Sequence, residues 1–120
     1  MKEAYPKNIK RLLHEWKAEA HERELCRELT KLDRCFAQWR VGEIGSGELS
    51  IRVHEYEVGP SRELFKRYNN GQHDFNVAYA IVTGILGRDE VPAEILEALE
   101  RHLAFYQSMM DRGELKMPGE

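Results

Sequence analysis

The densest group of residues that could do chemistry lies between residues 54 and 62. His54 and Glu57 are three residues apart, so on a helix both side chains could reach one ligand or metal ion. Arg62 follows a Gly-Pro pair, and its guanidinium could hold a carboxylate or phosphate at the start of a helix. An anion is therefore the ligand that we expect if this is a site, whereas an Arg–Glu brace at a helix corner is the structural alternative. The candidate binding residues are His54, Glu57, Arg62, Tyr56 and Tyr68.

The stretch from residue 51 to residue 68 also permits a helix-turn-helix interpretation. Phe65 could pack the second helix inward and leave Lys66 and Arg67 free to enter a DNA groove. Glu55, however, occupies a position where close helix packing requires a small residue. The formal net charge of −3 also opposes phosphate binding, so nucleic acid is not the partner that we expect.

The sequence contains no motif for other kinds of catalytic or metal chemistry, and we predict no cofactor and no bound metal. Metal sites in helical bundles pair Glu-x-x-His motifs on two helices, and this chain has none. It also lacks a nucleophile elbow, a phosphate loop and a dinucleotide fingerprint, so no catalytic residue is assigned. Cys26 and Cys35 would be ~13 Å apart along one helix, which is too far for a disulfide, so we expect two reduced thiols.

The pattern of apolar residues predicts an all-α bundle of four to five helices with a long N-terminal helix. This helix should run from Pro6 to Arg40, and a short helix should restart after Gly59-Pro60-Ser61. Residues 48–58 fit either a strand or a helix, and we favour helix because no partner strand is near. Residues 75–86 are apolar on almost all sides and should form the buried central helix, with Gly84 at a close helix crossing. A last helix should run from Val91-Pro92 to Gly113.

The first helix changes its apolar face near residues 20–24. The stripe that begins at Ile9 and ends at Ala20 points ~170° away from the stripe that runs from Leu25 to Trp39. Either the helix breaks between these stripes or one continuous helix buries two opposite faces against two bodies. The second arrangement predicts a homodimer that pairs through the first helix.

Length and composition predict one globular domain over residues 1–112, followed by a loose tail over residues 113–120. The 120 residues are 42% hydrophobic, which is enough for a packed core, and no apolar run is long enough for a membrane span. A signal-peptide pattern is absent from the first residues, so we expect a cytoplasmic protein. The first-ranked function is an interaction or regulatory module that acts as a homo-oligomer. Anionic small-molecule binding or catalysis is the alternative, and DNA binding comes third.

Overall fold

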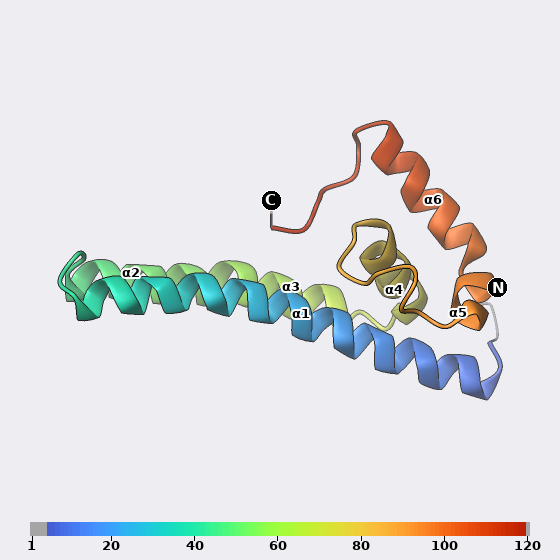
Figure 1. The fold of residues 1–120 in the computed structure, drawn as a ribbon, viewed down its shortest axis with the longest axis horizontal. Helices are drawn as coiled ribbons and strands as arrows, with labels where there is room; N and C mark the ends of the chain where they lie inside the picture. The colour runs from blue at the N-terminus through green and yellow to red at the C-terminus, as the bar shows by residue number, and fades with distance from the viewer. Residues whose placement is uncertain (1–4, 120) are drawn as a thin grey trace.

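The computed structural model describes residues 5–119, and this part of the chain contains helices and no strand. Its long axis is that of α1 (Lys7–Arg40), which is flanked at one end by an antiparallel helix and at the other by the remaining helices (Figure 1). The principal extents of 53 × 32 × 28 Å reflect this elongated shape. The predicted fold class, a small helical bundle with a long N-terminal helix, is therefore confirmed.

The first helix is continuous through residues 20–24, which settles the question that the two apolar stripes raised. No glycine or proline interrupts its 34 residues. Its first half buries Ile9, Leu13 and Ala20, whereas Leu29 and Trp39 in its second half remain exposed. One stripe thus packs inside the chain, and the other is only partly covered by it.

The helix α2 (Ser46–Tyr56) continues through a π-helical segment, η1 (Glu57–Ser61), into α3 (Arg62–Tyr68). The helical interpretation of residues 48–58 is confirmed, but the predicted interruption at Gly59-Pro60-Ser61 is wrong. Pro60 has no amide hydrogen, and in an α-helix its ring would collide with the carbonyl of Tyr56. The wider π turn accommodates the ring without ending the helix, so no corner forms there.

We call the antiparallel pair of helices the arm; it comprises residues 21–40 of α1 and residues 46–68. A tight connection joins its two helices, and the indole of Trp39 donates a hydrogen bond of 3.0 Å to the Ser46 hydroxyl there. Buried Leu49, Leu64 and Tyr68 pack against α1 along the arm. Figure 1 shows the two helices of the arm lying side by side, away from the other helices.

The head comprises the first half of α1 together with α4 (His73–Val82), α5 (Ala93–Ala98) and α6 (Glu100–Asp111). The central helix α4 packs against both α1 and α6 and buries Val77, Ala78 and Ala80 completely. Residues 75–86 are thus largely buried as predicted, but the helix itself ends at Val82 rather than Leu86.

Two details of the head differ from the sequence prediction. Gly84 does not lie at a helix crossing; it is exposed, with φ of +85° in the turn after α4, a conformation that glycine adopts without strain. The last helix is divided at Leu99, where φ of −102° and ψ of 12° change its direction. This bend lets α6 pack along α4 while Ile95 and Leu99 stay fully buried.

Candidate functional site

The residues that the sequence analysis proposed as a site do not converge in the structure. His54, Glu57 and Arg62 are all exposed, and no hydrogen bond or ion pair joins them among the described residues. Arg62 lies within a continuous helical run rather than at a helix start, so helix-terminal amides do not add to its charge there. Ligand binding by these three residues stays a prediction, and the continuous helix also removes the helix-turn-helix geometry.

The two tyrosines of that predicted group lie elsewhere. Tyr56 is half-buried against α1, beside a shallow cavity of about 160 Å³ that Lys31, Cys35 and Arg52 also line. Tyr68 is fully buried at the place where the arm meets the head. Its surroundings form the most highly connected polar network of the described chain, and this network is our candidate functional site.

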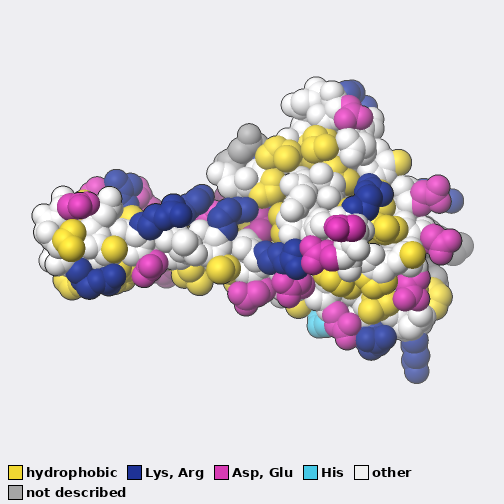
Figure 2. Space-filling model, in the orientation of Figure 1, with side chains coloured by type: hydrophobic (Ala, Val, Ile, Leu, Met, Phe, Trp, Pro, Cys, Tyr) yellow, Lys and Arg dark blue, Asp and Glu magenta, His cyan; other side chains and the backbone are white. Residues whose placement is uncertain are grey.

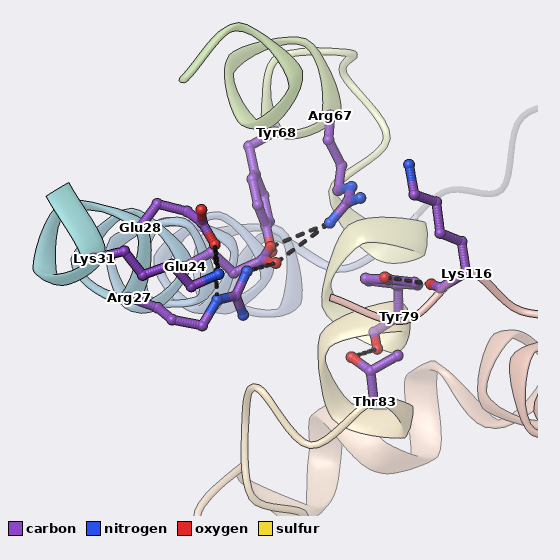
Figure 3. Close-up of polar contacts among 9 residues, drawn as sticks. All are labelled: Glu24, Arg27, Glu28, Lys31, Arg67, Tyr68, Tyr79, Thr83 and Lys116. Atoms are coloured by element: carbon purple, nitrogen blue, oxygen red, sulfur yellow. Dashed lines mark hydrogen bonds and ion pairs between the residues drawn. The ribbon is translucent and has the colours of Figure 1, made fainter. Parts of the chain in front are cut away.

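A buried carboxylate forms the centre of this network. Glu24 on α1 is 1% exposed, and it accepts a hydrogen bond from the Tyr68 hydroxyl (Figure 3). Arg67 lies 3.3 Å from one of its oxygens, and Arg27 lies 3.5 Å from the other. A carboxylate this far from water needs such partners, because desolvation of an unpaired charge costs several kcal/mol.

Burial and the hydrogen bond to Glu24 raise the pKa of Tyr68 far above its ordinary value of 10.0. The phenol therefore stays protonated and serves as a permanent hydrogen-bond donor to the carboxylate. Its ring also stacks on His21, with a centroid distance of 4.7 Å and an interplanar angle of 17°. These contacts fix α3 against α1 at the junction of arm and head.

Glu28, one helical turn further along α1, is nearly buried and has two cationic partners. Arg27 and Lys31 each donate a hydrogen bond of 3.1 Å to it. Burial alone would raise the pKa of Glu28, but the hydrogen bonds from Lys31 and Arg27 outweigh it and hold the pKa below its ordinary value. Glu28 is therefore ionised at neutral pH, and its charge is compensated locally.

A cavity of about 240 Å³ opens beside this network, and we call it the junction cavity. Glu24 and Arg27 of α1 line one side, and Leu64 and Arg67 of α3 line another. The π-helical segment adds Gly59 and Pro60, and the segment after α6 adds Lys116 and Met117. Widened π turns inside helices are frequent at functional sites, which gives this location a second reason for attention.

Tyr79 of α4 contacts two of the residues that line the junction cavity, Arg67 and Lys116. Its ring lies under the Arg67 guanidinium, 4.8 Å from the guanidinium carbon to the ring centroid. Its hydroxyl donates a hydrogen bond of 2.7 Å to the backbone carbonyl of Lys116 (Figure 3). The chain after Gly113 is thereby held over the cavity, although it has no regular secondary structure.

The arm is polar on the side of the junction cavity and apolar on the other. Around the axis of α1, Leu25, Leu29 and Phe36 point in directions that agree within ~40°. This direction is rotated away from that of Glu28 and Cys35, which line the shallow cavity beside Tyr56. On the opposite helix, Val53 is rotated in the same sense by ~40–60° from Leu49 and Tyr56, and Phe65 by ~60–100° from Leu64 and Tyr68. Residues rotated in the same sense on two antiparallel helices lie on the same side of the pair. We call this surface the apolar face; its residues are Leu25, Leu29, Phe36, Val53 and Phe65.

The sequence reasoning missed Glu24, Arg67 and the junction cavity. The alternating charges of residues 24–31 do predict helical ion pairs, since acids and bases lie three or four residues apart. What the sequence did not reveal is the burial of Glu24, because its partner Tyr68 lies 44 residues away.

Comparisons with known proteins supply no family or relative for this chain. No family model, no curated protein and no solved structure matches it. Within residues 5–119, no helix has the length and apolar character needed to cross a membrane, and no cluster of three or more potential metal ligands occurs.

Proposed function

We propose that this protein is an interaction module that pairs with a second copy of itself through the apolar face of the arm. The observation that carries this proposal is the exposure of large apolar side chains on that face. Leu29 is 47% exposed, Val53 is 37% exposed and Phe65 is 64% exposed. Contiguous apolar patches on monomeric proteins are usually small, and larger ones tend to mark binding surfaces.

A second copy suits this face because the arm is only one layer thick. Two antiparallel helices bury the line along which they touch but leave both flanks open. Stacking one arm on another gives a four-helix arrangement in which the apolar flanks cover each other. Two-fold symmetry is the commonest solution for such self-association, since the same patch then serves both partners.

The charges along the two edges of the apolar face are compatible with self-pairing. Asp33 and Arg40 lie on the α1 edge, and Glu57 and Arg62 lie on the opposite edge, so each edge carries one acid and one base. A two-fold axis along the arm sets each α1 edge against the opposite edge of the other copy. Neither edge then presents an excess of like charge to its partner.

A charge placed on the apolar face tests the pairing. Phe65→Glu puts a carboxylate on this face, and we expect the variant to elute from a size-exclusion column as a smaller species than the wild-type protein. Phe105 on α6 offers a matched control, because it is also aromatic and 53% exposed but lies on the head. Phe105→Glu should elute with the wild type. Coelution of both variants with the wild type, with all three at the monomer position, contradicts the proposal.

A further inference from the structure

The junction cavity lies on the side of the arm away from the apolar face, so a site there is independent of the proposed pairing. The cavity volume of about 240 Å³ is below the ~300–1,000 Å³ of pockets for drug-sized ligands, so a ligand would be small. Pro60, Leu64 and Met117 contribute apolar wall, and Arg67 and Lys116 contribute cationic groups. Figure 2 shows Lys and Arg side chains along the arm, with Asp and Glu side chains among them.

Arg67 has hydrogen-bonding capacity that the protein does not use. One of its terminal nitrogens, Nη1, approaches both oxygens of Glu24, at 3.3 and 3.4 Å. These distances exceed the ~2.7–2.9 Å of strong charge-assisted hydrogen bonds. No hydrogen bond from its Nη2 or Nε is found among the described residues, so a planar pair of donors remains for a carboxylate. The Tyr79 ring, which stacks under the guanidinium, limits its orientation.

Lys116 brings a second available cation to the same cavity. The Tyr79 hydroxyl fixes its backbone carbonyl, and its ammonium makes no hydrogen bond or ion pair within residues 5–119. Figure 3 shows the Lys116 and Arg67 side chains on the same side of Tyr79. Tyr79 of α4 thus contacts both residues, with its ring at the Arg67 guanidinium and its hydroxyl at the backbone of Lys116.

The charges around the cavity favour a ligand of low charge. The lining carboxylates are Glu24, Glu28 and Glu63, and the lining cations are Arg27, Arg67 and Lys116. Arg27 pairs with both Glu24 and Glu28, and Lys31 binds Glu28 from outside the cavity lining. Arg67 and Lys116 can therefore face an anion, and Glu63 disfavours a multiply charged one.

We propose that the junction cavity binds a small monocarboxylic acid with an apolar body. The carboxylate accepts hydrogen bonds from Arg67 and lies near the ammonium of Lys116, while the hydrocarbon part contacts Pro60, Leu64 and Met117. The segment that contains Lys116 and Met117 forms one wall of the site, so ligand binding also holds this segment in place.

Sodium hexanoate is the probe that tests this site, with 1-hexanol as its uncharged counterpart and inorganic phosphate as an anion without an apolar body. Amide NMR shifts of the full chain report binding and its location together. We expect hexanoate to shift the amides of Gly59, Arg67 and Met117 with a Kd on the order of 0.1–10 mM, as is usual for so few atoms. Hexanol and phosphate should each bind at least about tenfold more weakly, because hexanol lacks the carboxylate and phosphate lacks the hydrocarbon chain.

Two variants and a control connect the binding to the cations. Lys116→Ala removes an exposed ammonium that supports no fold contact, and it should weaken hexanoate binding about 3–10-fold. Arg67→Gln should weaken it more, and Lys10→Ala, which removes an exposed lysine of α1 in the head, should leave the affinity unchanged. The absence of any hexanoate shift at about 20 mM overturns the proposal, as does undiminished affinity in the Lys116→Ala variant. Equal affinity for hexanol or for phosphate overturns the assignment to a monocarboxylate.

Discussion

The Tyr68 hydroxyl donates a hydrogen bond to the Glu24 carboxylate, and this contact joins the last turn of α3 to the middle of α1. Both side chains are buried, and they lie at the point where the arm leaves the head. Arg67 and Arg27 lie 3.3 Å and 3.5 Å from the Glu24 oxygens and bring positive charge to this position. The same network forms one wall of the junction cavity, so the stability of the fold and the shape of the cavity depend on shared residues.

Removing this hydrogen bond should destabilise the protein without changing its fold. Tyr68→Phe keeps the ring on His21 but deprives a buried carboxylate of its shortest contact. We expect the free energy of unfolding to fall by about 1–3 kcal/mol, the usual cost of an unsatisfied buried polar group. Chemical denaturation monitored by circular dichroism measures it.

Tyr106→Phe provides the matched control for that variant. Tyr106 is half-buried in the head, and its hydroxyl makes no hydrogen bond among the described residues. Its loss should change the unfolding free energy by less than about 0.5 kcal/mol. Equal effects of the two substitutions would show that the Tyr68–Glu24 contact has no special role.

Stability should depend on pH near neutrality because of two histidines. The pKa values of His21 and His73 are lowered below the ordinary value of 6.5. Burial is the larger cause, and the nearby positive charge of Lys17 is the second. The unfolded chain therefore binds more protons than the folded chain as the pH falls through 6.5, and folding stability decreases. This contribution is fully present above pH 6.5 and is lost as the pH falls toward the folded-state pKa values. Melting temperatures measured between about pH 7.5 and pH 5 should fall accordingly.

A substitution separates this effect from that of the carboxylates. His73→Gln should make the melting temperature less dependent on pH, because glutamine does not titrate. Hydrogen bonds from Arg23 and from the Gly87 amide lower the pKa of Glu90 to about 2. The contribution of Glu90 to folding stability is therefore lost only below pH 4.5. An identical slope in the wild type and in His73→Gln contradicts the assignment.

The central position of α4 can be tested with a pair of isoleucines. Ile81 is 5% exposed in α4, whereas Ile51 is 55% exposed in α2. Ile81→Ala should lower the free energy of unfolding by about 2–5 kcal/mol through lost transfer energy and a cavity. Ile51→Ala should change it by less than about 1 kcal/mol, and denaturant midpoints compare the two. Similar midpoint shifts would show that burial in α4 is assigned incorrectly.

The sequence predicted the elements with strong periodicity and failed where distant contacts decide the outcome. The apolar run that includes Val77 and Ile81 is buried as expected, because such a segment has no polar face to expose. The Gly59-Pro60 pair is typical of a helix end, but the helix continues through it as a π turn. Beyond this turn, Leu64 and Tyr68 are buried against α1. Tertiary contacts thus override a local signal.

The candidate site was predicted only in part for the same reason. Tyr68 was among the proposed residues, and Arg67 and Leu64, its neighbours on α3, line the junction cavity. The sequence placed it with His54 and Arg62, because a corner at Pro60 would have brought those residues together. Without the corner they lie exposed along a continuous helical run, and the cationic groups of the cavity come from three separate segments.

The mass of the protein in solution tests the central claim, that the apolar face of the arm pairs with a second copy. Sedimentation equilibrium at about 100 μM should detect a dimer with a micromolar or tighter Kd. We predict a mass of twice 14.0 kDa for the wild type and a shift toward 14.0 kDa for Phe65→Glu. A wild-type mass of 14.0 kDa throughout a concentration series up to about 1 mM would contradict the account.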